Sequence, residues 1–113
     1  MKIITKNQTI ERKNNEACVV TEFPLDDNLI DFAVIKITDR YPDAGYAINQ
    51  KCKEIVYIQD GNGKVVLNNK EYLLHAGDLV LIEAGEKFYW EGEMNLFISC
   101  RPAFTIEQHK IVE

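Results

Sequence analysis

The sequence has few of the residues that hold metals or cross-link chains. It contains only two histidines, and its three cysteines (Cys18, Cys52 and Cys100) are far apart, with no Cys-x-x-Cys pair. An odd number of widely spaced cysteines is not a disulfide framework. It is typical of proteins from a reducing compartment. We therefore expect a cytoplasmic protein.

Long apolar runs and an excess of basic residues are also absent. The first residues, Met1–Gln8, have no apolar core of signal-peptide length, and no later stretch approaches the length of a membrane span. Thirteen basic residues face eighteen acidic ones, which gives a net charge of −5. Nucleic acids and anionic membranes attract basic surfaces. Neither a nucleic acid nor a membrane is therefore an expected partner.

What the sequence does contain is a succession of short β-rich runs separated by turn residues, which is typical of a sandwich or barrel. Its 113 residues fit a single domain. We predict tight hairpins at Asp60–Gly63, Asn68–Asn69 and Ala84–Gly85, because Gly and Asn tolerate positive φ. We also predict one helical turn after Pro102. The predicted strands are Ile3–Thr5, Thr9–Lys13, Ala17–Glu22, Ile30–Thr38, Tyr46–Gln50, Glu54–Gln59, Lys64–Leu67, Glu71–Leu74, Leu79–Ile82, Lys87–Glu91 and Asn95–Arg101.

Several predicted strands, such as Ile55–Ile58, carry apolar residues on both faces. A strand with one wet face would alternate between apolar and polar residues. These strands are therefore expected to be covered on both sides. One side would be the lumen of a barrel, and the other an outer layer of strands or a partner subunit.

The segment from Glu54 to Gly92 resembles the two conserved motifs of the cupin superfamily. The first motif separates a Glu from a Gly by six residues, as Glu54 and Gly61 are separated here. The second places two glycines at the spacing of Gly77 and Gly85. The resemblance covers residues 46–104 and implies an all-β, single-domain cupin over residues 1–113. The implied architecture is a jelly-roll β-barrel, a double-stranded antiparallel β-helix.

The metal ligands of that family are missing. In metal-binding cupins two histidines precede the motif Glu, and a third closes the second motif. Here the first pair would fall on Ala47 and Asn49, or on the residue after each, and the third on Phe88. Of four ligand positions only Glu54 matches. One carboxylate with an amide and an aromatic ring is a poor donor set for a transition metal. No metal and no cofactor are therefore expected, and His75 and His109 are expected to be exposed surface residues.

Glu54 is the candidate catalytic residue. If it faces the lumen, a carboxylate beside aromatic rings is poorly solvated, which raises its pKa and suits a general acid or base. A salt bridge with Lys51 or Lys53 is the simpler alternative. Alternation along the strands and the motif positions give the candidate ligand-binding residues, which are Asn49, Gln50, Val56, Phe88, Trp90 and Cys100.

Other residues have both a functional and a structural interpretation. The thiol of Cys52 lies between two lysines that could lower its pKa, but a packing role is more common. Arg101 could bind a ligand carboxylate or pair with a surface acid. Tyr57, Tyr89 and Trp90 could pack in the core or an interface, or stack on a planar ligand.

Three functions remain open. The first is a metal-free barrel that binds a small molecule of unknown identity, as a sensor or accessory module. The second is a metal-independent isomerase, epimerase or lyase that uses Glu54 as general acid or base. The third is a structural dimer with a filled barrel. The resemblance also implies a homodimer through N-terminal strands, for which the apolar runs Ala17–Val20 and Phe32–Ile37 give a physical reason.

Overall fold

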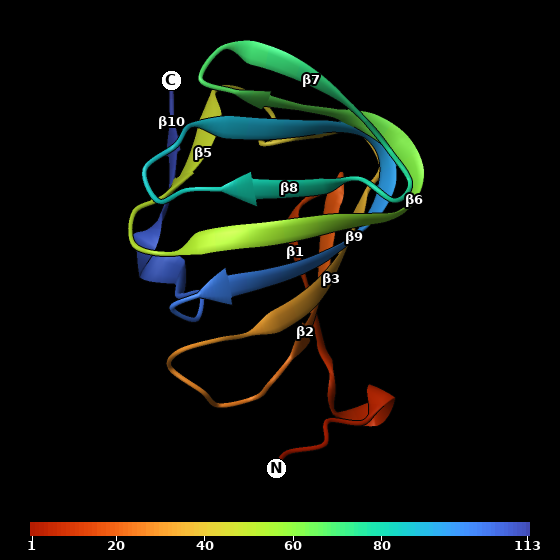
Figure 1. Cartoon of the computed structure of the whole chain (residues 1–113), viewed down its shortest axis with the longest axis vertical. Helices are drawn as coiled ribbons and strands as arrows, with labels where there is room; N and C mark the ends of the chain where they lie inside the picture. Colours follow the sequence, from red (N-terminus) through yellow and green to blue (C-terminus); the bar gives the residue numbers. More distant parts are fainter.

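The computed structural model describes residues 1–113, and nearly all of its regular structure is β-strand (Figure 1). Two single-turn 3₁₀ helices complete it, and neither has the length or hydrophobicity to cross a membrane. The elements are η1 (Lys6–Gln8), β1 (Ile10–Asn15), β2 (Cys18–Phe23), β3 (Phe32–Ile37), β4 (Arg40–Tyr41), β5 (Tyr46–Asn49), β6 (Lys53–Leu67), β7 (Lys70–His75), β8 (Leu79–Ile82), β9 (Phe88–Arg101), η2 (Ile106–Gln108) and β10 (His109–Val112).

Two long strands, β6 and β9, organise the molecule. They pair antiparallel from Lys53 opposite Arg101 to Leu67 opposite Phe88. The first half of β6 also pairs with β8 and its second half with β7. The second half of β9 pairs with β3, and its first half with β4 and β5. One layer therefore runs β8-β6-β9-β3-β2-β1, and the other runs β7-β6-β9-β5-β10. The predicted all-β jelly roll is confirmed.

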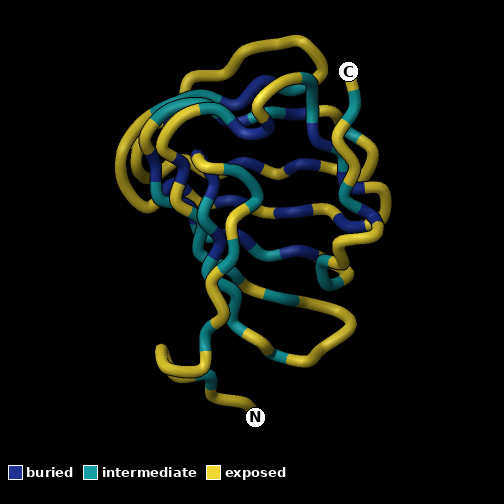
Figure 2. Tube along the Cα trace, turned by 180° about the vertical axis from the view of Figure 1, so that it is seen from behind, coloured by how far each residue is buried: buried dark blue, intermediate teal, exposed yellow.

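The core lies between these two layers. Along the first half of β6 the residues alternate strictly, so that Glu54, Val56 and Ile58 are buried while the residues between them are exposed. Figure 2 shows the same alternation of buried and exposed stretches along the central strands. A cluster of 16 buried hydrophobic residues fills much of the interior. The period of two, which the sequence shows only imperfectly, is therefore strict along the first half of β6.

The hairpin predicted at Asp60–Gly63 is wrong, because β6 continues through it with a bulge between Ile58 and Asp60. The glycines allow a close approach of β9 rather than a turn. A Cβ at Gly61 would lie 2.1 Å from the carbonyl oxygen of Glu93, and its φ is +84°. The Ala84–Gly85 segment is a turn, but β8 and β9 do not pair across it. At Asn68–Asn69 the predicted hairpin is present, with φ of 49° and 69°.

The two ends of the chain also differ from the expectation. Residues Ile3–Thr5 form no strand, whereas the 3₁₀ turn Ile106–Gln108 lies close to the helical turn expected after Pro102. The tail then continues into β10, which pairs with β5 from His109 opposite Asn49 to Val112 opposite Tyr46. This unpredicted strand brings a histidine to the barrel wall.

Candidate functional site

A cavity lies between the two layers of the barrel. Its volume open to water-sized molecules is about 60 Å³, and ten of its 17 lining residues are hydrophobic. Part of its wall is aromatic and is formed by Phe88, Trp90 and Phe104. A smaller group of polar side chains faces the same space. A concave, mostly apolar cavity with a few convergent polar groups is the usual form of a small-molecule site.

Glu54 is the buried carboxyl group of this cavity. It lies on β6 between Ile82 of β8 and Cys100 of β9, and its side chain is among the few buried charged groups of the chain. Its Oε1 accepts a hydrogen bond from Asn49 Nδ2 at 3.2 Å. Oε2 of Glu54 has no protein partner. The only fully buried side-chain polar atom that lacks a partner is Nε of Arg40, so Oε2 is not fully buried and must reach the open space of the cavity.

The environment keeps this carboxyl group protonated. Burial, followed by the nearby Cys52 and Asp31 groups, raises the pKa of Glu54 from 4.5 to about 8. At neutral pH roughly nine-tenths of the molecules then carry a proton there. Since Oε1 accepts from Asn49, the proton resides on Oε2. Glu54 therefore presents an O–H donor to the cavity at neutral pH and an anionic acceptor above it.

A chain of hydrogen bonds continues from Glu54 through Asn49 to His109 and Tyr41. His109 Nδ1 lies 2.7 Å from Asn49 Oδ1, and His109 Nε2 lies 2.7 Å from the hydroxyl of Tyr41. The Asn49 oxygen can only accept, so Nδ1 carries the hydrogen. Burial, with a smaller effect of Arg12, lowers the pKa of His109 and keeps the ring neutral. Nε2 is then a bare acceptor, and the Tyr41 hydroxyl donates to it.

The charged side chains around the cavity already have partners within the chain. Arg12, the one cation among the lining residues, donates to Glu22 at 2.7 Å and also to Asn14. Asp31 accepts from the backbone N–H groups of Cys100 at 2.7 Å and Phe104 at 2.9 Å. With His109 neutral and Glu54 protonated, the charged groups left at the cavity are the Arg12–Glu22 ion pair and the hydrogen-bonded Asp31 carboxylate.

Five of the seven candidate site residues meet in this cavity. They are Asn49, Glu54, Phe88, Trp90 and Cys100. The other two do not. Gln50 is exposed outside the cavity, because alternation along β5 turns Ala47 and Asn49 inward instead. Val56 is fully buried in the core and does not line the open space.

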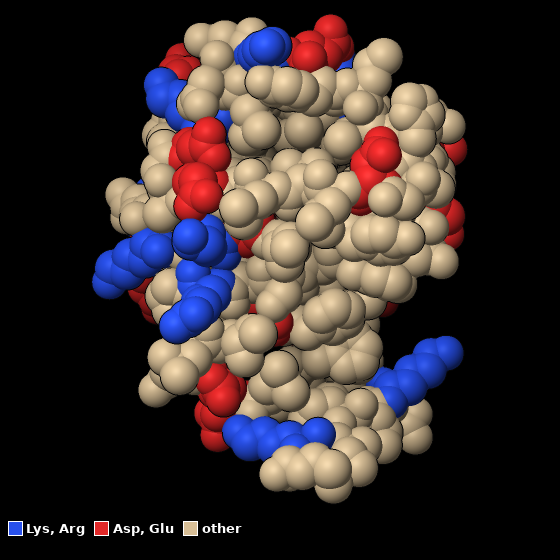
Figure 3. Space-filling model, viewed as in Figure 1, with Lys and Arg blue, Asp and Glu red and all other residues tan.

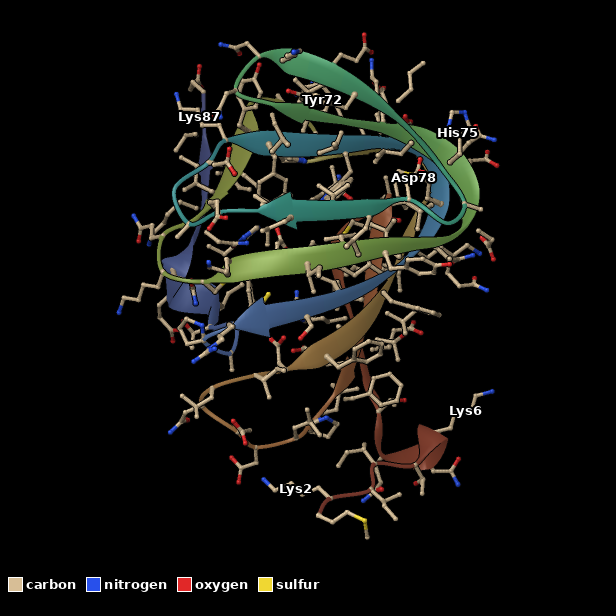
Figure 4. All side chains as sticks on the ribbon, in the orientation of Figure 1. Lys2, Lys6, Tyr72, His75, Asp78 and Lys87 are labelled. Carbon is tan, nitrogen blue, oxygen red and sulfur yellow. The ribbon has the colours of Figure 1, made fainter.

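The expectations for the two histidines and for the Glu54 ion pair need correction. His75 is exposed at the β7–β8 connection, with Nδ1 at 3.8 Å from Asp78 Oδ2, and Figure 4 shows both away from the barrel interior. His109, however, is half-buried and lines the cavity. No lysine pairs with Glu54, since Lys53 pairs with Glu83 at 3.3 Å. Arg101 is exposed outside the cavity.

Sequence reasoning missed the polar residues that come from outside the two motifs. Arg12 lies on β1, Asp31 just before β3, Tyr41 on the two-residue strand β4, and His109 on the tail strand β10. None belongs to a recognisable local pattern. The pairing of β10 with β5 sets His109 beside Asn49, and this non-local contact assembles the chain of hydrogen bonds from Glu54 to Tyr41.

The thiols belong to the structural framework. Cys52 is buried, its backbone N–H donates to Gln108 Oε1 at 2.7 Å, and its thiol is hydrogen-bonded with that of Cys100. That hydrogen bond, rather than the flanking lysines, lowers the pKa of Cys52. The same contact, together with burial, raises the pKa of Cys100.

The donor set of the cavity does not fit a divalent metal ion. No group of three or more His, Cys, Asp or Glu side chains could hold one. Both ring nitrogens of His109 are engaged, and Glu54 is held as the neutral acid. Metal ligands must be deprotonated, with a free lone pair directed at the ion.

Comparison with known proteins agrees with this fold. The family model described as "Cupin domain" matches residues 43–107, more than half of the chain. The chain belongs to the cupin family. No curated protein matches it.

Solved structures extend the comparison over the whole chain. A variant of Streptomyces PAC13 with uridine has a TM-score of 0.89 and 17% identity, covering 100% of this chain and 92% of that one. A second structure, described as Pac13, a unique nucleoside dehydratase, has the same TM-score, identity and coverage. KdgF from Halomonas sp. has a TM-score of 0.72 and 11% identity, covering 92% of this chain and 96% of that one. At these identities the similarity shows the fold.

Proposed function

We propose that this cupin binds a small, uncharged polar molecule in its cavity and that Glu54 acts on it as a general acid and base. The observation that carries the proposal is the Glu54 carboxyl group itself. It is buried, its pKa is raised to about 8, and Oε2 faces open space rather than another residue. A carboxyl group with a pKa close to working pH can both give and take a proton at useful rates.

The lining of the cavity supports an uncharged ligand with a flat ring. Phe88 and Trp90 pack edge to face, with centroids 6.1 Å apart, and give an aromatic wall on which a ring can rest. Asn14, Asn49 and Glu54 offer amide and carboxyl hydrogen bonds, which an uncharged heterocycle or sugar hydroxyl satisfies. A nucleoside contains both a flat heterocycle and a sugar with hydroxyl groups. The PAC13 structure with uridine makes them the first class of compound to test.

An isomerase, epimerase or lyase reaction fits these groups. In a lyase reaction that eliminates water, one group takes a proton from carbon while another gives a proton to the departing hydroxyl, so the proton count is balanced. Glu54 can serve in either step, since its carboxyl oxygen Oε2 gains or loses the proton within the cavity. Burial raises the pKa of the Tyr41 hydroxyl, so this group keeps its proton and serves as a hydrogen-bond donor to His109 rather than as a base. Removing a nearby acid–base group typically slows such steps by 10²–10⁴-fold.

The test combines binding with turnover. We would screen a panel of uncharged nucleosides and cyclic polyols by ligand-observed NMR, then follow each bound compound for conversion with wild type and with Glu54→Gln. Gln is nearly isosteric and can still accept from Asn49, so the variant should bind while turnover falls at least about a hundredfold. Glu93→Gln, on an exposed residue of β9, is the matched control and should leave turnover unchanged.

Three results would contradict the proposal. Undiminished turnover in Glu54→Gln would remove Glu54 from the chemistry. Binding by wild type without conversion of any bound compound would identify a binding module and refute the catalytic role. Failure of every uncharged compound to bind, while charged ones bind, would refute the ligand class.

A further inference from the structure

Three acidic side chains line the cavity, and only two of them lack a basic partner. Glu22 is paired with Arg12 at 2.7 Å, which leaves Glu54 and Asp31. On the face of the molecule shown in Figure 3, acidic side chains are dispersed over the outer surface, and several lie next to lysine or arginine groups. Asp31 differs from these surface groups, because it shares an interior space with Glu54.

Glu54, Cys100 and Asp31 form a row across β6, β9 and the start of β3. Glu54 lies opposite Cys100 in the register of β6 and β9. Asp31 immediately precedes β3, and its backbone N–H donates to the carbonyl oxygen of Cys100 at 3.3 Å. All three residues line the cavity, so the two carboxyl groups approach it from either side of one thiol. Two strand spacings of about 4.8 Å each place the backbones of Glu54 and Asp31 about 10 Å apart.

Four hydrogen bonds fix Asp31 in this row. Besides the bond from its own N–H, its backbone oxygen accepts from Ser99 Oγ at 2.7 Å. Its carboxylate accepts from the N–H groups of Cys100 at 2.7 Å and Phe104 at 2.9 Å. A carboxylate has about four lone-pair sites, so these two N–H groups leave others for a ligand. Asp31 is therefore a firmly positioned hydrogen-bond acceptor at the wall of the cavity.

The two carboxyl groups have different environments, which suit different protonation states. Burial, then Cys52 and then Asp31 raise the pKa of Glu54 to about 8, so Glu54 holds a proton at neutral pH. Asp31 is bound by two N–H donors, and such donors form their strongest hydrogen bonds with an ionised carboxylate. A pair of titratable groups whose environments separate their protonation states is the usual arrangement of an acid and a base in one site.

On the basis of the lyase reaction proposed above, we propose that Asp31 is a second catalytic residue, the base that takes the proton from carbon while Glu54 is the acid. The C–H bond breaks, its proton forms an O–H bond with the Asp31 carboxylate, and its electron pair forms a carbon–carbon double bond. The C–O bond breaks with its electron pair, and the departing oxygen takes the proton of Glu54 Oε2 and leaves as water. Exchange with solvent then removes the proton from Asp31 and returns one to Glu54.

The width of the row suits a ligand that reacts at two neighbouring carbon atoms. Side chains of one row stand roughly perpendicular to the sheet, so the carboxyl groups are about as far apart as their backbones. An approach of about 3 Å at the carbon and a hydrogen bond of about 2.7 Å at the hydroxyl leave about 4 Å of the row for the reacting fragment. A hydrogen and a hydroxyl on adjacent carbons fit this space. The ligand class is thus narrowed to uncharged alcohols that have a removable hydrogen next to the carbon bearing the hydroxyl.

Carbon-13 NMR of the side-chain carboxyl groups tests the pair without any ligand. In the wild type, the Glu54 resonance should move in a large step near pH 8 and in a smaller step where Asp31 ionises. Asp31→Asn should lower the pKa of Glu54 by about one unit, because it removes a charge about 10 Å away.

Asp27→Asn is the matched control for this experiment. Asp27 also accepts from two backbone N–H groups, at 2.8 Å and 3.3 Å, but it is exposed outside the cavity. It should leave the pKa of Glu54 unchanged. A single step for Glu54 in the wild type, an unchanged pKa in Asp31→Asn, or an equal change in Asp27→Asn would overturn the proposal. The wild-type titration decides even if a variant does not fold.

Kinetics then test the division of roles, with the compound that the wild type converts in the Glu54→Gln experiment as the probe. The wild-type kcat/KM should rise as Asp31 ionises and fall near pH 8 as Glu54 loses its proton. Asp31→Asn should turn over at least about a hundredfold more slowly and lose the rising limb, whereas Asp31→Glu and Asp27→Asn should keep that limb. Circular dichroism checks that each variant is folded.

The outcomes separate this proposal from the function on which it rests. Full turnover in Asp31→Asn together with a loss in Glu54→Gln would overturn the role of Asp31 alone. A wild type that converts no bound compound would overturn both. A double variant, Asp31→Asn with Glu54→Gln, should lose little more than the slower single variant, because both groups act in one reaction. Losses that multiply would contradict this joint role.

Discussion

The raised pKa of Glu54 has a measurable effect on the stability of the fold. Its pKa is 4.5 as an ordinary side chain and about 8 in the folded protein. The folded state thus holds its proton more tightly than the unfolded chain does. The stability contributed by the neutral carboxyl is fully present below about pH 4.5 and is lost as pH rises through about 8. A shift of about 3.5 pKa units corresponds to on the order of 5 kcal/mol, at 1.36 kcal/mol per unit.

Glu54→Gln isolates this contribution, because the amide cannot ionise but can still accept the hydrogen bond from Asn49. We expect the free energy of unfolding of the variant, minus that of the wild type, to increase between pH 5 and pH 8 with a slope of up to about 1.4 kcal/mol per pH unit. Urea unfolding followed by the fluorescence of Trp90, the single tryptophan, measures it. Glu93→Gln should show a flat difference. A flat profile for Glu54→Gln would refute the buried neutral carboxyl.

Two further predictions concern the neighbouring polar groups. Nitrogen-15 NMR should find His109 neutral with its hydrogen on Nδ1, and a hydrogen on Nε2 in the wild type would refute the hydrogen-bond chain. Tyr41→Phe should raise the pKa of His109, because it removes the hydroxyl donor that stabilises the unprotonated Nε2. Asp31→Ala leaves the N–H groups of Cys100 and Phe104 without their acceptor, so denaturant unfolding should show a loss of about 2–4 kcal/mol in the free energy of unfolding. A loss below about 0.5 kcal/mol would contradict a stabilising role for these two hydrogen bonds.

Most of the fold follows from local sequence signals. Strands such as Leu79–Ile82 and the hairpin at Asn68–Asn69 rest on β-propensity and on residues that adopt positive φ. The wrong predictions occur where a local sequence feature is explained by a contact with a distant part of the chain. The glycines at 61 and 63 have the composition of a turn, but they are small because β9 crosses close to β6 there. The sequence of one strand does not show that another strand passes close to it.

The residues of the candidate site show the same difference between local and non-local signals. Residues on the two motifs, such as Glu54 and Phe88, could be assigned to the interior because alternation fixes which side they face. Asn49 and Gln50 could not be distinguished until the pairing of β5 with β10 set the register. Tyr41 and His109 lie 68 positions apart, and only the closed barrel brings them into contact.

The position of the imidazole is the reason why we propose proton chemistry rather than metal chemistry for this barrel. In the position where the resemblance to metal-binding cupins implies a ligand histidine on β5, this chain has Asn49. The one imidazole of the cavity stands opposite it on β10, and Asn49 connects it to Glu54. A metal ligand needs a free nitrogen lone pair and a deprotonated carboxylate partner. Here one ring nitrogen donates, the other accepts from a phenol, and the carboxyl group keeps its proton. Of the positions that would have held an ion, Glu54 instead carries a titratable proton on Oε2 at the wall of the cavity.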